Sequence, residues 1–404
     1  MKLILLAAWL VAMPLRAAAM SPPDTGQVAQ SPPITSADAL ARYLRDTPAG
    51  DSPLDKLPTG AKKRFLISLE FGSNGLGGFD ASDLEEELDD AQIRQLLLLF
   101  GAESHASRLH GAQSAHRMCA IPGDCPESRI EQRFDRFYGL EHSLGHQRIP
   151  DQQKGRKLAL AYRKLFAAEQ TPDGLKTVSN SDLKLLYRAA DTASFWSAGT
   201  VFLSDMSRTL DELQHRGMTT TADVMRLHDK LVTRRQFVEA DALASRYPAA
   251  KLQPLPTLHD QVEPNHQGPT MLTVDPQGIA MQRHPFNINA PIQIVVVAGC
   301  HFAADAARDI HADLALDRVF KQHSVWLGSQ SEKLGDVSEW NREHPDQPMN
   351  IAWQDSEWSM LDSWAMPTFY IFRNGKLVNQ FSGWSKETEP QQLRAALHQA
   401  GLLD

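Results

Sequence analysis

The sequence lacks a long apolar run after its first 20 residues, and it lacks a cluster of basic side chains. A helix needs about 18 or more consecutive apolar residues to span a bilayer, so we expect no stable membrane insertion. The 404 residues include 41 basic and 49 acidic ones. A net acidic chain without a basic cluster argues against partners such as nucleic acid and anionic membrane surfaces.

The first 19 residues are the exception to this lack of apolar runs. Lys2 gives a positively charged start, residues 3–15 are apolar, and three alanines stand just before residue 20. The pattern predicts a secretory signal peptide over residues 1–19, cleaved after Ala19, and hence a periplasmic or secreted protein. Its removal takes away Lys2 and Arg16 and leaves 39 basic against 49 acidic residues, a net charge of −10.

Cysteine is scarce, with three residues in the whole chain. An odd count excludes complete pairing within the chain, so at least one thiol lacks an intramolecular partner. In "CAIPGDC" the turn dipeptide Pro122-Gly123 can bring Cys119 and Cys125 together. We predict a structural bridge between them, which would stabilise the fold by about 2.4 kcal/mol. A redox-active pair or a rearranged pairing is the alternative; if the bridge forms, Cys300 is the free thiol.

The residue pattern divides the rest of the chain into four segments. Residues 20–35 are rich in proline, serine and glutamine, which predicts a flexible lead-in. Residues 36–250 show helical periodicity and almost no strand pattern, which predicts an all-α domain. Residues 251–268 are proline-rich without periodicity, and we interpret them as a linker. Residues 269–404 form the last segment.

Short strand-like runs alternate with helical runs in residues 269–404. Two such runs flank the turn residues 275–278, which is a hairpin signal. The later predicted strands are "IQIVVVA", "SVWLG", "NIAWQD", "TFYIFRNG" and "KLVNQFSGW", and the last predicted helix is "EPQQLRAALHQAG". This order predicts an α/β sheet with one antiparallel edge. The expected fold class is therefore an α-helical N-terminal domain followed by an α/β C-terminal domain.

Cys300 follows the strand-like run "IQIVVVA" and Gly299, and it directly precedes an alanine-rich helical segment. A thiol at a helix N-terminus faces unpaired backbone N–H groups and the positive end of the helix dipole, and both favour the reactive thiolate. The charged form of the adjacent His301 would favour it further. Redox motifs usually carry a second cysteine three positions later, where this chain has Ala303. The alternative is that Cys300 is only a small buried hydrophobic residue.

A second stretch, "AMPTFYIFRNGKLVNQFSGW", has Pro-Thr before an apolar strand, an Asn-Gly turn and a strand that ends in glycine. Together with the placement of Cys300, this order resembles the thioredoxin fold over residues 269–404. The hairpin before "IQIVVVA" and the 67 positions between Cys300 and Pro367 resemble the exported TlpA-like branch. The resemblance implies a cis-proline at Pro367, preceded by Met366, which packs beside the thiol and leaves a backbone edge for a substrate chain.

Ala303 departs from the dithiol pattern of this family, because alanine cannot attack a mixed disulfide and release the substrate. Three interpretations remain open. Cys300 is a monothiol that needs an outside thiol, or it binds and shuffles client disulfides, or the site is degenerate and kept for binding.

Histidines offer a further candidate site. His105, His110 and His116 precede Cys119, and another pair of histidines stands four positions apart in "EHSLGH". Zinc needs tetrahedral sets of imidazole and thiolate ligands, and these spacings fit no strong zinc pattern. We therefore interpret them as surface or loop residues rather than as metal ligands.

Tryptophans and glycines form two other groups. Trp353, Trp358 and Trp364 precede Pro367 and form either an aromatic wall near the thiol or part of the core and rim. The glycine-rich stretch "LEFGSNGLGGFD" has no strand leading into it and no Lys-Ser/Thr after it, so we interpret it as a turn-rich link and not as a phosphate loop.

These patterns lead to one functional expectation and one rival. We expect an exported thioredoxin-like protein whose monothiol site exchanges with protein thiols or disulfides, as an oxidoreductase or isomerase. Cys300 would be the nucleophile, His301 would tune the thiolate and Pro367 would form the substrate edge. An external reductant thiol would be a further partner, and no organic cofactor is expected. The rival is a non-catalytic, degenerate thioredoxin-fold binding protein or chaperone-like adaptor.

Overall fold

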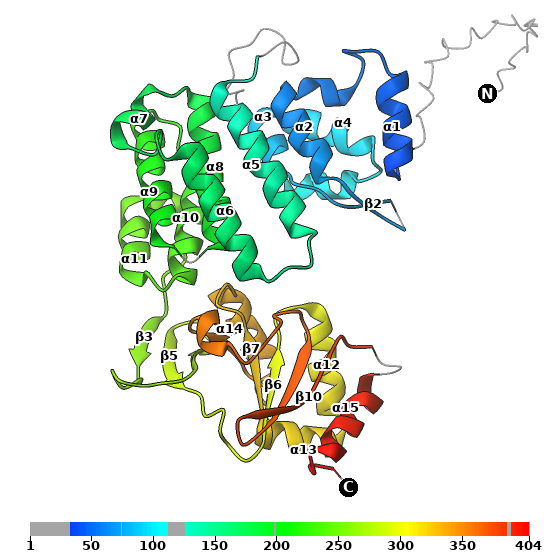
Figure 1. Cartoon of the computed structure of the whole chain (residues 1–404), viewed down its shortest axis with the longest axis vertical. Coiled ribbons are helices and arrows are strands. Elements are labelled where there is room, and N and C mark those ends of the chain that lie inside the picture. The colour runs from blue at the N-terminus through cyan, green and yellow to red at the C-terminus, as the bar shows by residue number, and fades with distance from the viewer. Residues whose placement is uncertain (1–32, 74, 112–125, 198, 386–388, 404) are drawn as a thin grey trace, which may run out of the picture. The chain divides into compact units, whose positions relative to one another are not determined.

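The computed structural model describes residues 33–73, 75–111, 126–197, 199–385 and 389–403. The predicted signal peptide, most of the predicted lead-in, and both Cys119 and Cys125 lie outside the described residues. The described chain is mainly helical before residue 250 and holds a mixed eight-stranded sheet after it (Figure 1). A helical part followed by an α/β part is therefore observed, as the sequence predicted.

The chain divides into two compact units, residues 1–115 and 116–404. This division differs from the single helical domain over residues 36–250 that the sequence indicated. Its physical basis is that the helices before residue 112 bury a core of their own, which includes Phe65, Leu84 and Leu96. The later helices bury a separate core around Phe137, Leu186 and other apolar residues.

The first unit combines short helices with one small hairpin. Its described elements are α1 (Ala37–Asp46), η1 (Pro53–Lys56), α2 (Thr59–Ser68), β1 (Glu70–Gly72), β2 (Gly75–Gly78), α3 (Ser82–Glu87), α4 (Asp90–Leu98) and η2 (Glu103–Arg108). Ser36 caps α1 by accepting from the backbone N–H of Ala39. The glycine-rich stretch forms the antiparallel β1–β2 hairpin, not the turn-rich link expected from the sequence.

The second unit begins with a helical bundle. Its elements are α5 (Arg129–Gly145), α6 (Asp151–Phe166), α7 (Pro172–Thr177), α8 (Asn180–Trp196), α9 (Thr200–His215), α10 (Thr221–Thr233), α11 (Phe237–Arg246) and η4 (Pro248–Ala250). Apolar residues at helical spacing, such as Leu183, Leu186 and Ala190, face the shared core. Within the described residues, no helix is both long and apolar enough to cross a bilayer.

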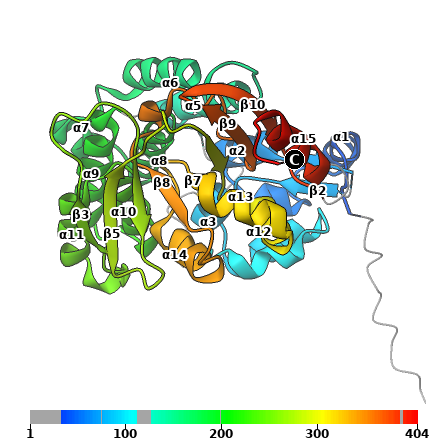
Figure 2. The same ribbon diagram turned by 90° about the horizontal axis from the view of Figure 1, so that it is seen from below.

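The α/β part of this unit follows the bundle. Its elements are β3 (Thr257–Asp260), β4 (Thr270–Val274), β5 (Ala280–Pro285), β6 (Gln293–Val297), α12 (His301–Ala312), α13 (Leu314–His323), β7 (Ser324–Gly328), α14 (Leu334–Glu343), β8 (Met349–Ala352), η5 (Asp355–Trp358), β9 (Thr368–Arg373), β10 (Lys376–Ser382) and α15 (Glu389–Gln399). Figure 2 shows α12 and α13, in yellow, one after the other.

The strands lie in the order β10-β9-β6-β7-β8-β4-β5-β3. The central strands β6, β7 and β8 are parallel, whereas β9 and β10 are antiparallel on one side and β4 and β5 on the other. The sequence predicted one antiparallel edge; the outermost pair β10–β9 is antiparallel and the outermost pair β3–β5 is parallel, but β4 adds antiparallel pairs on that second side. The β4–β5 hairpin, which the sequence did predict, joins the same sheet through β8.

One further strand comes from the segment interpreted as a linker. Within residues 251–268, β3 pairs in parallel with β5, and the N–H of Thr257 donates to the carbonyl of Ile279 at 2.8 Å. Proline flanks this strand but does not enter it, so its backbone donors remain free to pair.

Two cores cover the two faces of the sheet. Helices α12 to α15 pack on one face, together with Val296, Trp326 and Phe369. The other face packs against Phe286 and the buried Trp358. Because the central strands are buried on both faces, their sequences are continuous apolar runs that end where the loops of the candidate site begin.

Candidate functional site

Cys300 stands where the central strand β6 gives way to helix α12. It is the N-cap residue of this twelve-residue helix, and no acidic residue occurs in the first turn. Gly299 before it has φ of 141°, a conformation that favours glycine. Cys300 therefore stands at the N-terminus of a helix, as the sequence predicted, although its side chain makes no capping hydrogen bond.

The thiol faces the loop that leads into β9. Its Sγ lies 3.5 Å from the carbonyl oxygen of Met366, to which it donates a weak hydrogen bond. The Met366–Pro367 peptide is cis, which confirms that sequence prediction. Pro367 is buried, and its carbonyl accepts from the N–H of Gly383 at 2.8 Å. The structure thus brings Cys300 and the Pro367 segment together although they are far apart in the chain.

The chain neighbours of Cys300 leave it partly open to solvent. His301 and Phe302 are exposed, with ring centroids 3.9 Å apart, and Met366 is 37% exposed. Ala303, at the place of a second cysteine, is fully buried. Cys300 itself is partly exposed, and it is the free cysteine of the described chain. These facts do not support the alternative of a buried hydrophobic residue.

Glu332 also belongs to this site, and the sequence gave no signal for it. A Cβ atom placed on Gly299 would lie 2.6 Å from its Oε1 atom and 2.9 Å from Sδ of Met366. A Cβ atom on Gly328, the last residue of β7, would also collide with the side chain of Glu332. The carboxyl group therefore lies over two glycines, one of which directly precedes Cys300.

The environment of this carboxyl group disfavours its charge. Burial raises the pKa of Glu332 to about 7, and the nearby carboxylates of Asp336 and Asp355 add to the rise. The group therefore exchanges a proton close to neutral pH. A carboxyl group with a raised pKa over Gly299, the residue before a partly exposed thiol, is the arrangement expected of a functional site rather than of a structural ion pair.

The three tryptophans do not act as one wall in this structure. Trp358 is buried in the core, where its ring tilts against Phe286 at 5.0 Å. Trp353 packs with Arg235 and Arg283, whose guanidinium carbons lie 5.5 and 4.2 Å from its ring centroid. Trp364 is partly buried beside the same core as Trp358. Core packing, the other interpretation of the sequence, therefore applies to Trp358.

The histidines take local partners. His142 and His146 lie on or directly after α5, with ring centroids 4.5 Å apart. No group of three or more metal-ligating side chains occurs in the part of the chain that the structure describes. His116 lies outside that part.

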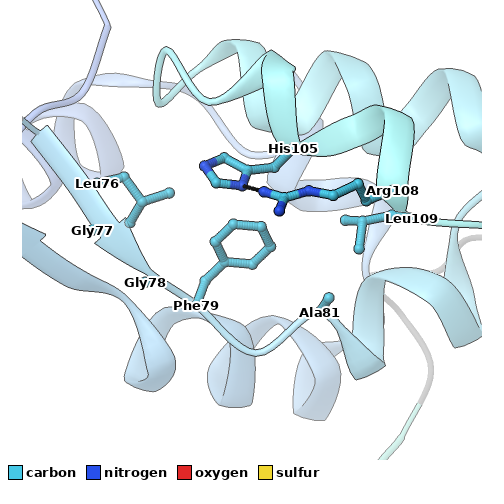
Figure 3. A pocket seen from close by; sticks show the side chains of 8 residues that line it. All are labelled: Leu76, Gly77, Gly78, Phe79, Ala81, His105, Arg108 and Leu109. Atoms are coloured by element: carbon cyan, nitrogen blue, oxygen red, sulfur yellow. Dashed lines mark hydrogen bonds between the residues drawn. The ribbon is translucent and has the colours of Figure 1, made fainter. Parts of the chain in front are cut away.

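A separate hollow of about 240 Å³ occurs in the first unit (Figure 3). Phe79 and Leu109 line it, and the guanidinium of Arg108 donates to Nδ1 of His105 at 2.6 Å across its rim. Most of the lining residues are apolar or glycine, and the two polar ones, His105 and Arg108, are partly buried and exposed, respectively.

Comparison of this chain with models of protein families, with curated proteins and with solved structures finds no match.

Proposed function

We propose that this protein is an exported, thioredoxin-like protein in which Cys300 exchanges with the disulfides or thiols of protein clients. The observation that carries the proposal is the position of the thiol: Cys300 is the N-cap residue of helix α12, and its Sγ lies 3.5 Å from the Met366 carbonyl oxygen. The location of Pro367 after that carbonyl agrees with the resemblance drawn from the sequence. His301 would favour the thiolate when it is charged.

The chemistry follows from a single thiol. The Cys300 thiolate attacks one sulfur of a client disulfide, a bond forms between Sγ and that sulfur, and the client S–S bond breaks. The departing client thiolate takes up a proton. Because Ala303 cannot attack the new bond, an external thiolate must attack its client sulfur. A disulfide forms between the external thiol and the client, the bond to Cys300 breaks, and the Cys300 thiolate is released. Exposed Phe302 and Met366 provide an apolar rim that an extended client segment can contact.

A second candidate function rests on the same rim. The missing second cysteine and the exposed apolar side chains also suit an adaptor that binds clients without covalent exchange. The two functions differ in one property, the ability of Cys300 to form a mixed disulfide.

The test uses the purified full chain and a disulfide-bonded peptide as the probe. We expect a mass increase of one peptide strand, mapped to Cys300, that disappears when a small thiol is added. Cys300→Ser should show no such adduct. If iodoacetamide labels Cys300 but no mixed disulfide forms, the adaptor function replaces the exchange function; peptide mapping separates Cys300 from the other two cysteines.

A further inference from the structure

The turn between α10 and α11 contacts the loops of the α/β part directly. Arg235 in this turn has a left-handed backbone, with φ of 60°. Its guanidinium donates to the carbonyl oxygens of Ala352 at 2.8 Å, Trp353 at 3.2 Å and Gln330 at 3.4 Å. Burial lowers the pKa of Arg235 to about 10, so the group stays charged at neutral pH. One side chain of the bundle thus joins two loops at the ends of β7 and β8.

The contact is reciprocal, because Gln330 donates back to the bundle. Its Nε2 atom lies 2.9 Å from the carbonyl of Thr233, and its backbone N–H donates to Asp355 at 2.7 Å. Phe237, the first residue of α11, packs against Trp353 with ring centroids 6.2 Å apart. Gln330 is therefore held from both sides, and we call the contacts of Arg235 and Gln330 the clamp.

The clamped loop is the one that carries Glu332. Residues 329–333 connect β7 to α14, and the N–H of Glu332 donates to the carbonyl of Ser329 at 3.1 Å, which closes a tight turn around Gln330. The position of Gln330 therefore fixes the direction in which Glu332 leaves the turn. That direction takes its carboxyl group over Gly299, the residue that directly precedes Cys300.

We propose that the helical bundle controls the thiol site through this clamp, by holding the carboxyl group of Glu332 beside Cys300. Arg235 and Gln330 are positioning residues in this arrangement. The inference rests on the proposed function and adds a regulatory group to it. Movement of the bundle, for example when it takes up a client, would release the 329–333 loop and change the charge beside the thiol.

The direction of the effect follows from the charges. Asp336 on α14 and Asp355 on η5 face Glu332, and Arg234 and Arg235 face Asp355. Above about pH 7 Glu332 becomes a carboxylate, and a negative charge beside Cys300 disfavours the thiolate. Below about pH 6 the protonated carboxyl exerts no such repulsion. The bundle thus keeps in place a carboxylate that slows the reaction of Cys300 at neutral and higher pH, an effect that we call the brake.

The test measures the rate at which iodoacetamide labels Cys300, by peptide mass, from pH 5.5 to 8.5. We expect Glu332→Gln to match the wild type at low pH and to react about three- to fivefold faster at high pH. Arg235→Lys and Gln330→Leu keep Glu332 but disturb the clamp, so each should recover at least half of this increase. Adding Glu332→Gln to either of them should then have less effect than it has alone.

The matched control is Glu339→Gln on α14, which removes an exposed carboxylate far less buried than Glu332 and should leave the profile unchanged. Circular dichroism confirms folding, and two clamp variants are used so that the misfolding of one leaves the other. Superimposed profiles of Glu332→Gln and the wild type would overturn the proposal. So would a Glu332→Gln increase that neither clamp variant shares.

This readout separates the inference from the proposed function. Labelling needs no client, so a Glu332-dependent profile without mixed disulfides supports the brake and removes the exchange function. If mixed disulfides form but the labelling profiles of Glu332→Gln and the wild type superimpose, the exchange function is supported and the brake is removed. A Cys300 that is inert to iodoacetamide at every pH overturns both.

Discussion

Two clusters in this molecule contain an arginine and acidic side chains, and the arginine binds a different kind of group in each. In the first unit Arg64 and Asp83 are almost completely buried, and they form a two-pronged pair with distances of 3.0 Å and 2.7 Å. In the second unit Arg235 gives its N–H groups to backbone carbonyls, while Asp355 and Glu332 lie nearby with raised pKa values. In the first cluster the arginine therefore hydrogen-bonds directly to the carboxylate.

The difference indicates two roles. A bidentate arginine–carboxylate pair sealed from solvent fixes α2 against α3 and has a structural role. In the second cluster the guanidinium of Arg235 binds the carbonyl groups of two loops. Desolvation raises the pKa of the carboxyl groups of Glu332 and Asp355. Among the described residues, the second cluster is the one that reaches the residue before a partly exposed thiol, so it is the one expected to affect chemistry.

The largest expected effect is on stability, from Asp83→Ala. Removing this carboxylate leaves Arg64 buried without its main partner, which should lower the free energy of unfolding by about 3–5 kcal/mol. Urea unfolding followed by circular dichroism measures this loss. The exposed Asp46→Ala is the control and should stay within about 0.5 kcal/mol of the wild type.

The same variant tests the distinction between the clusters. At a urea concentration where Asp83→Ala is still folded, Cys300 should react with iodoacetamide as fast as in the wild type. A changed rate would mean that the first cluster also acts on the thiol, and the contrast between a structural and a functional cluster would fail.

The order of elements in residues 269–404 could be predicted because strands buried on both faces leave long apolar runs. "IQIVVVA" became β6, "SVWLG" became β7, and Cys300 took its predicted place at the start of α12. Edge strands leave a weaker pattern, which is why β3 was missed. The β4–β5 hairpin was predicted, but its pairing with β8 in the same sheet was not. The predicted bridge between Cys119 and Cys125 and the signal peptide remain predictions, outside the described residues.

Glu332 and Arg235 could not have been found from the sequence. Glu332 stands in a polar loop, and only the fold brings Gly299 and Gly328 under its side chain. Arg235 follows a helix end, where a basic residue ordinarily complements the helix dipole. Its partners in the α/β part are more than 90 positions later in the chain. Contacts of this kind depend on tertiary packing and have no local pattern.

Ala303→Cys is expected to lower stability by a smaller amount and to add a reductase activity. Ala303 is fully buried one helical turn after Cys300, so the larger side chain should lower stability by about 1–3 kcal/mol. The new cysteine should form a disulfide with Cys300 and give insulin reductase activity when an electron donor is present. The wild type should show little such activity.

Ala306→Cys is the matched control, because it is equally buried on α12 but one further turn from Cys300. It should form no disulfide within the motif and show no reductase activity. If Ala303→Cys folds and still neither property appears, then the site has lost more than its second cysteine, and the adaptor function gains support over exchange.

The smallest expected effect concerns the pH dependence of stability and Glu332. Its pKa rises from 4.5 to about 7 on folding, so between these values the folded chain keeps a proton that the unfolded chain has lost. The stability that this proton contributes is complete below about pH 4.5 and is lost as the pH rises toward 7. Glu332→Gln cannot ionise and escapes this loss.

We therefore expect Glu332→Gln to have nearly wild-type stability at pH 4.5 and to exceed the wild type by about 1 kcal/mol at pH 8. The gain is smaller than the full pKa shift implies, because solvent screens part of the charge of this partly exposed group. Urea unfolding at the two pH values measures it. Glu339→Gln removes an exposed carboxylate, and its stability should differ from that of the wild type by the same amount at both pH values. A Glu332→Gln difference that is also constant with pH would mean that the carboxyl group titrates alike in both states, and the contrast with the Arg64–Asp83 cluster would lose its basis.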